Sequence, residues 1–164
     1  MGVKIYNNNF YKVGDFVRYN GEICEVKFFN ARISKFSSIY TNSTYTVSNS
    51  TIYDIEKIKE DWVSIFVFNY EDDKEKILET LDIIAEKIDQ IDHVKGATTL
   101  GLLELNKAGA SYGLLYRILP KFYLPTSTKI NAVVMDEFKA AGLRPSSDDD
   151  RNLNMMNPLI TKKG

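Results

Sequence analysis

The stretch KVGDFVRYNGEICEV, residues 12–26, decides the fold of the first part of this chain. It reads as a loop, a strand, a two-residue turn and a second strand. The Asn20-Gly21 pair predicts a type I′ hairpin, because that turn needs a positive φ at both central residues. A β-rich unit is therefore expected close to the N-terminal end.

The residues after this hairpin extend the β-rich unit to residue 58. Apolar residues continue from Ile23 to Phe36, and such a length predicts a strand that bends and serves two parts of a small barrel. Polar turns are expected at residues 41–43, where Asn42 can take the left-handed conformation, and at residues 48–50. Residues 52–58 are expected to form a last strand.

The spacing of apolar residues changes after Trp62. Residues 63–68 read as a strand, and acids at 71–73 favour the start of a helix, since the helix dipole attracts negative charge there. The helix is predicted from apolar residues at helical spacing. They are Ile77, Leu78, Leu81, Ile84, Ala85 and Ile88.

Two more strands and a second helix are predicted beyond this helix. The strands are residues 98–105 and 112–119, with a turn at 107–111. Pro125 precedes Thr126 or Ser127 as the expected N-cap, and Gly142 is the expected end. The buried face of this helix is predicted to hold Ile130, Val133, Val134 and Phe138. The order strand–helix–strand–strand–helix, with room for a final strand, is that of a ferredoxin-like unit.

Composition and charge limit the classes of protein to which this chain can belong. The chain has 164 residues, of which 44% are hydrophobic and 26% charged, which suits one globular domain or two small ones. A net charge of −1 makes it a poor electrostatic partner for nucleic acid. The expected organisation is a short lead at residues 1–11, a β unit at 12–59, an α/β unit at 60–145 and a polar tail at 146–164.

A search for catalytic or metal-binding residues finds little. His93 is the only histidine and falls in a loop after a helix, so it is expected on the surface. Cys24 is the only cysteine, which excludes an internal disulfide and indicates a small buried residue in a reducing compartment. Acids at 71–73 and 148–150 lack the spacing of a calcium-binding loop, and no phosphate-binding glycine motif occurs. We therefore expect no enzyme, no cofactor and no metal.

No stretch approaches the roughly 20 apolar residues that span a bilayer. The N-terminal residues also lack the apolar core of a signal peptide. The chain as given is expected to be soluble and cytosolic.

Several short motifs resemble the small-conductance mechanosensitive channel family. An aromatic residue followed by "VGD" and a glycine-led strand is similar to the start of the family's β domain, and residues 45–52 are similar to its Asn-Ser turn. Residues 105–111 and 138–143 are similar to its α/β domain. The residues that carry the resemblance are Phe10, Val13, Gly14, Asp15, Gly21, Val26, Asn49, Ser50, Gly109, Ser111 and Gly142.

The resemblance implies a fold and a role. The fold is α+β, with a small Sm-like β-barrel followed by a ferredoxin-like α/β domain. The chain is then the cytoplasmic part of a cell-membrane protein whose pore helix, and with it the only contact with lipid, lies upstream. The full protein opens under membrane tension and releases ions and small solutes in osmotic downshock. This part forms a homo-oligomer, a heptamer in the family, that encloses a vestibule, and no nucleic acid is expected to bind.

Two departures from the family pattern stand out. Ser48 replaces a usual proline, and residues 143–150 lack the proline-rich strand that helps to close a shared C-terminal barrel. Two other functions remain open at this point. One is an Sm-like ring that binds nucleic acid through Arg18, Lys27, Arg32 and Lys35. The other is a ligand-sensing domain, because ferredoxin-like folds often bind small effectors.

Overall fold

The computed structural model describes residues 11–52 and 55–146. The chain divides into two compact units, residues 1–59 and 60–164, and each is treated by itself. Phe10 and all but the first residue of the expected polar tail lie outside the described residues.

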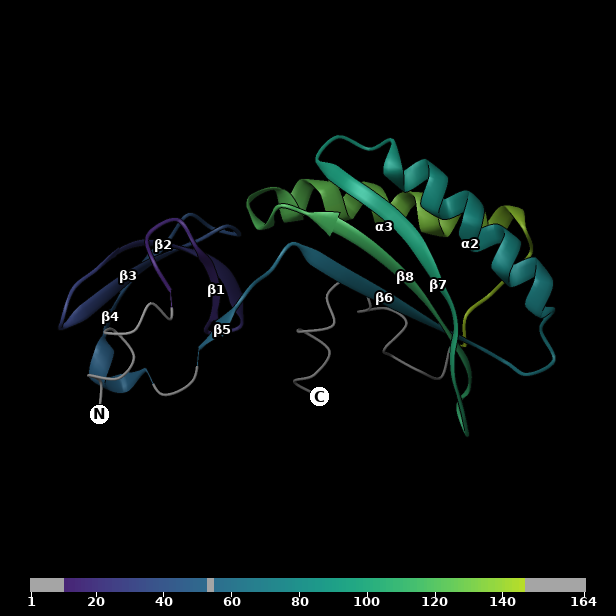
Figure 1. Cartoon of the computed structure of the whole chain (residues 1–164), viewed down its shortest axis with the longest axis horizontal. Coiled ribbons are helices and arrows are strands. Elements are labelled where there is room, and N and C mark those ends of the chain that lie inside the picture. The colour runs from purple at the N-terminus through teal and green to yellow at the C-terminus, as the bar shows by residue number, and fades with distance from the viewer. Residues whose placement is uncertain (1–10, 53–54, 147–164) are drawn as a thin grey trace. The chain divides into compact units, whose positions relative to one another are not determined.

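The first unit is one antiparallel sheet of five strands, in the order β4-β3-β2-β1-β5 (Figure 1). A short 3-10 helix, η1 (Asn49–Thr51), follows β4. The strands are β1 (Phe16–Tyr19), β2 (Glu22–Phe29), β3 (Ile33–Ser38), β4 (Thr44–Ser48) and β5 (Glu56–Lys57).

The predicted hairpin is confirmed. Asn20 and Gly21 have φ values of 55° and 79°, and Tyr19 pairs with Glu22 across the turn. Asn42 also takes the left-handed conformation, with a φ of 62°. In both turns a residue that tolerates positive φ reverses the chain.

The prediction of a single bent strand from Ile23 to Phe36 is wrong, because a turn divides this stretch into β2 and β3. Asn30 forms the turn: its side-chain oxygen accepts from the backbone N–H of Arg32 at 2.8 Å and of Ile33 at 2.9 Å. An asparagine can reverse a chain in this way without glycine or proline. The local sign of this turn is therefore Asn30, which lies between Phe29 and Ala31 in the sequence.

The last strand of this unit is shorter than predicted. Of residues 52–58, the described strand β5 holds only Glu56 and Lys57, and Tyr53 and Asp54 lie outside the described residues. Over residues 11–52 and 55–59 no pairing joins β4 to β5, so the sheet is open there and the closed barrel stays a prediction. The core of this unit is formed by Tyr11, Val17, Cys24, Val26, Phe36, Val47, Ile52 and Ile55.

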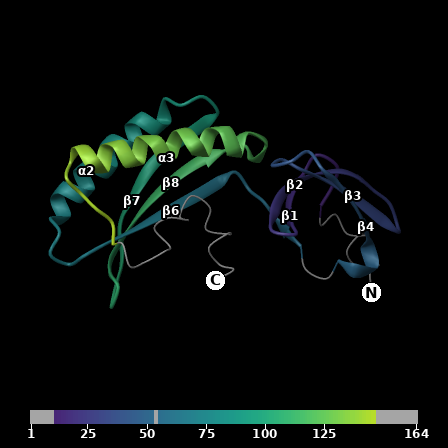
Figure 2. The ribbon, with the colours of Figure 1, turned by 180° about the vertical axis from the view of Figure 1, so that it is seen from behind.

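The second unit is a three-stranded antiparallel sheet in the order β6-β8-β7. Both long helices lie along the same face of this sheet, as the two opposite views show (Figures 1 and 2). The elements are β6 (Asp61–Phe68), α2 (Lys74–Asp89), β7 (Val94–Asn106), β8 (Gly109–Ile118), η2 (Pro120–Phe122) and α3 (Tyr123–Ala140).

Helix α2 forms where the sequence predicts it. Asp73 is its N-cap, and the carboxylate accepts from the backbone N–H of Glu75 at 3.0 Å and of Lys76 at 3.4 Å. Such a cap satisfies N–H groups that have no partner within the helix. The predicted face is buried except for the half-buried Leu78, and it includes Thr80 as well.

The predicted start of helix α3 is wrong. The helix begins at Tyr123 with Phe122 as its N-cap, and Pro125 lies within its first turn. Proline is tolerated there because the first-turn N–H groups have no partner within the helix. Thr126 and Ser127 are buried inside the helix, and the Ser127 hydroxyl donates to the Leu124 carbonyl at 3.1 Å.

The predicted end of α3 at Gly142 is confirmed. Gly142 has a φ of 71°, and its N–H donates to the Lys139 carbonyl at 3.0 Å. The next N–H, of Leu143, donates to the Phe138 carbonyl at 2.8 Å. These two bonds form a Schellman motif, which needs a left-handed residue at this position.

Aromatic side chains join helix α3 to the sheet of the second unit. The Trp62 ring lies 4.5 Å from Tyr123, and Phe138 makes edge contacts with Phe66 at 5.2 Å and Phe68 at 5.5 Å between ring centroids. The helix-facing side of the sheet is therefore a closed core.

The turn before β8 is shorter than predicted, since β8 already begins at Gly109.

Candidate functional site

The "VGD" motif forms the turn that leads into β1. Gly14 has a φ of 97°, and its N–H donates to the Val26 carbonyl at 2.9 Å. The Asp15 carboxylate accepts from the backbone N–H of Lys12 at 3.0 Å and lies 3.2 Å from the Lys57 ammonium. This turn brings Gly14, Asp15 and Val26 together, whereas Val13 is 60% exposed.

The Asn-Ser motif separates into one buried residue and one exposed residue. Asn49 is 1% exposed and is hydrogen bonded to Ser34 and to the Asn30 carbonyl. Ser50 is exposed and its hydroxyl lies 2.9 Å from that of Ser48. Sequence reasoning missed Ser34, which is fully buried, because a single serine within a strand carries no local sign of a distant partner.

The three motif residues of the second unit have separate structural surroundings. Gly109 packs against the Phe68 backbone at the end of β6, and Ser111 pairs with Val67 within the sheet. Gly142 ends α3. The predicted motif residues therefore hold turns and strand ends, and they do not converge on one pocket.

No catalytic arrangement is formed by the nucleophilic and metal-binding side chains that the structure describes. The exposed His93 ring stacks on Phe122, with 3.8 Å between centroids. Cys24 is fully buried. No three His, Cys, Asp or Glu residues gather into a metal site within residues 11–52 and 55–146. None of the helices in those ranges is long and apolar enough to cross a bilayer.

We expect Cys24 to resist alkylation in the folded protein. Burial, and secondarily the charge of Glu22, raise its pKa from 9.0 to about 11, and only the thiolate is reactive. Iodoacetamide at pH 8 should therefore modify the native protein at least about 100-fold more slowly than the urea-unfolded chain. Equal rates, measured by intact-mass analysis, would contradict the burial.

The raised pKa of Cys24 also makes the free energy of unfolding depend on pH. The thiol keeps its proton more strongly in the folded state than in the unfolded state. The contribution of the Cys24 thiol to the free energy of unfolding is therefore complete below pH 9. It is lost as the pH rises through the folded pKa of about 11.

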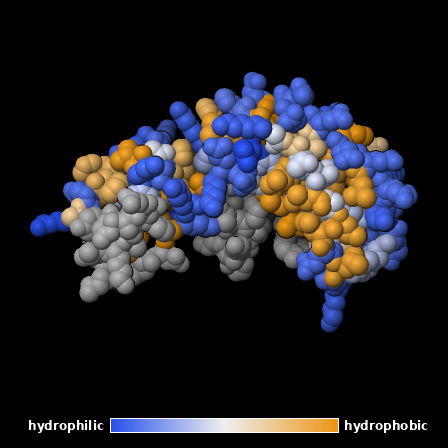
Figure 3. Space-filling model, viewed as in Figure 1, coloured by the Kyte–Doolittle hydropathy of each residue, from blue (hydrophilic) through white to orange (hydrophobic). Residues whose placement is uncertain are grey.

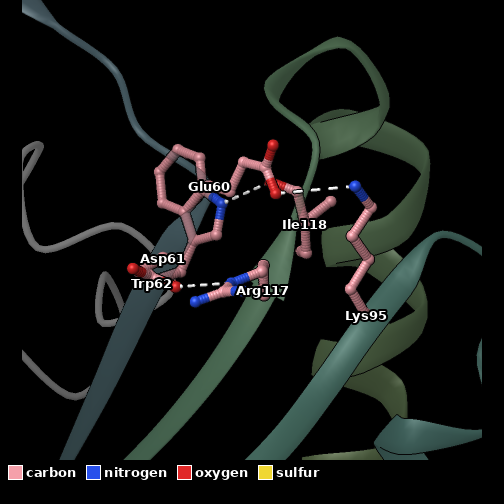
Figure 4. Close-up of polar contacts among 6 residues, drawn as sticks. All are labelled: Glu60, Asp61, Trp62, Lys95, Arg117 and Ile118. Carbon is pink, nitrogen blue, oxygen red and sulfur yellow. Dashed lines mark hydrogen bonds and ion pairs between the residues drawn. The ribbon is translucent and has the colours of Figure 1, made fainter.

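A shallow pocket of about 290 Å³ lies on the second unit, between the ends of β6, β8 and β7. Its charged residues are paired: Arg117 Nε lies 2.8 Å from an Asp61 oxygen, and Lys95 Nζ lies 3.6 Å from a Glu60 oxygen (Figure 4). These pairs are solvent-exposed and contribute little to stability. They leave the pocket without an unpaired charge among the described side chains that line it.

Exposed apolar side chains gather on the strands of the second unit (Figure 3). Four of them come from β7, which is an edge strand of the sheet. They are Leu100, Leu102, Leu103 and Leu105, with exposed fractions from 40% to 62%. Exposed apolar side chains that gather in one part of a surface are typical of a contact surface in a larger assembly.

Comparisons with known proteins find likeness in fold but not in sequence. No protein-family model matches the chain. No curated protein sequence matches it either. Among solved structures, MscS of Helicobacter pylori in its closed state matches with a TM-score of 0.59 and 14% identity, over 85% of this chain and 57% of that one.

A plant protein gives a similar match. MSL1 of Arabidopsis thaliana matches with a TM-score of 0.53 and 14% identity, over 89% of this chain and 56% of that one. The chain thus spans somewhat more than half of the length of these structures. The resemblance seen in the motifs is confirmed at the level of the fold, which this chain shares with the MscS family of mechanosensitive channels over most of its length.

Proposed function

We propose that this chain is the cytoplasmic domain of a mechanosensitive channel that opens under membrane tension and releases ions and small solutes. The observation that carries the proposal is the match of 85% to 89% of this chain, which is more than either unit alone, to MscS-family structures. Its first unit is an Sm-like β domain and its second a ferredoxin-like α/β domain. Residues 12–59 and 60–145 form these two domains.

The proposed role is assembly and filtering rather than chemistry. The solved structures that the chain resembles are channels, and no three metal-binding side chains gather among the described residues. The exposed leucines of β7 and the open edges of both sheets suit contacts between copies in a homo-oligomer, because unpaired strand edges can pair with a neighbour. The family resemblance implies a heptamer around a hollow vestibule.

Of the four basic residues behind the nucleic-acid alternative, Arg18 and Lys27 are paired with acids, whereas Arg32 and Lys35 are exposed. The Arg18 side chain is 9% exposed and lies 3.4 Å from Glu56, and Lys27 lies 3.2 Å from Glu25. Nucleic-acid binding draws on exposed, unneutralised basic groups. We therefore favour the channel domain.

We expect the β unit to be needed for assembly of the complete membrane protein. Detergent-solubilised complete protein should behave as a homo-oligomer in size-exclusion chromatography with light scattering. Deletion of residues 12–59 should abolish the homo-oligomer, whereas the control deletion of residues 153–164 should leave it intact. Oligomers of normal mass without residues 12–59 would contradict the assembly role of this unit.

A further inference from the structure

Tyr11 precedes every strand of the first unit, yet its side chain is in the core. It is 3% exposed. Its ring makes edge contacts with Phe29 and Phe36, with 5.5 and 5.8 Å between centroids. The chain is thus fixed to the core before it reaches the "VGD" turn and β1.

A buried chain of hydrogen bonds extends this attachment. The Tyr11 hydroxyl lies 2.6 Å from the Ser34 hydroxyl, which donates to the Asn49 side-chain oxygen at 2.7 Å. The Asn49 amide donates in turn to the Asn30 carbonyl at 2.7 Å.

The direction of these bonds follows from chemistry. An amide oxygen only accepts, so the single proton of Ser34 goes to Asn49 and Tyr11 must donate to Ser34. Burial raises the pKa of the Tyr11 phenol, which keeps the donating proton in place at neutral pH. Tyr11 is therefore bonded in series to β3, to η1 and to the turn before β3.

A pull on the backbone ahead of Tyr11 passes along the chain until it reaches a residue fixed to the fold. Tyr11 lies ahead of the "VGD" turn and is bonded through Ser34 to Asn49, so a pull from upstream reaches these bonds before it reaches the turn. We infer that Tyr11 is the mechanical anchor of the first unit, which carries force from the preceding residues into β3 and η1 and so protects the "VGD" turn from unravelling. Its meaning for gating rests on the proposed function, in which the pore helix leads to this residue.

The anchor can be tested on this chain without any channel. Tweezers handles are attached at the N-terminus and at an introduced Lys59→Cys, since Cys24 is buried and Lys59 is exposed. Tyr11→Phe keeps the ring and removes only the hydroxyl. The lifetime of the first unit at constant force should fall about tenfold, because a buried hydrogen bond is lost and Ser34 is left with one partner fewer.

Tyr45→Phe is the matched control. It removes another tyrosine hydrogen bond of the same unit, to Glu22 at 2.8 Å, but Tyr45 lies on β4 and not on the chain from Tyr11 to Asn49. Its lifetime should stay within about twofold of the parent protein. Ser34→Ala should reproduce the Tyr11→Phe effect, and the double variant should add little to it, because both remove the same link.

Equal lifetimes for Tyr11→Phe and Tyr45→Phe would overturn the anchor. So would full additivity of Tyr11→Phe and Ser34→Ala. None of these results depends on whether the complete protein conducts ions, so a failure of the anchor is distinguishable from a failure of the proposed function.

Discussion

Replacing Gly109 with alanine should destabilise the second unit more than the same exchange at any other glycine that the structure describes. A Cβ at this position would lie 2.2 Å from the Phe68 carbonyl oxygen, which belongs to the backbone and has little room to move. The residue also has a φ of 136°, a region that alanine rarely adopts. Backbone strain and overpacking each cost about 1–3 kcal/mol, so we expect a loss of about 3 kcal/mol or more.

The measurement is urea unfolding followed by tryptophan fluorescence. Trp62 is the only tryptophan and is buried in the second unit, so its signal reports on that unit. Gly101→Ala is the control, because Gly101 also has a positive φ, of 77°, but nothing lies within 4 Å of the added Cβ. It should cost only about 1–2 kcal/mol. A smaller loss for Gly109→Ala than for Gly101→Ala would contradict the predicted clash.

Phe138→Ala should cost about 3–5 kcal/mol, the usual range for emptying a buried phenylalanine site. Phe138 is 5% exposed and its ring contacts both Phe66 and Phe68, so its loss opens a cavity between α3 and β6. Met135→Ala, one turn earlier on the same helix and 57% exposed, should change the free energy of unfolding by less than about 0.5 kcal/mol. Similar losses for the two variants would mean that α3 does not pack on the sheet as described.

Local signals predicted the elements that are set by a few adjacent residues. Asn20 and Gly21 make the first hairpin, and Gly142 ends α3 with the bonding that its left-handed backbone allows. The helical spacing of apolar residues in α2 likewise follows from the sequence, because its burial repeats with the helix itself.

Two local features were mispredicted, and the buried link through Ser34 depends on partners far away in the chain. The Asn30 turn and the start of α3 at Tyr123 were mispredicted, since their residues resemble the strand or loop on either side. The link from Tyr11 to Ser34 joins residues 23 positions apart. A tyrosine and a serine at that separation have no common pattern until the sheet is formed, which is why the sequence indicated the motif residue Asn49 but not the two residues bonded in series with it.

The most direct test of the central claim is patch recording from membranes that contain the complete protein encoded by the source gene. If this chain is the cytoplasmic domain of a mechanosensitive channel, suction on the patch should open discrete conductance steps that protein-free membranes lack. The openings should be lost when residues 12–59 are deleted. A complete protein that lacks any membrane-spanning segment, or one that inserts in the membrane and stays silent up to the tension at which the patch ruptures, would contradict the account.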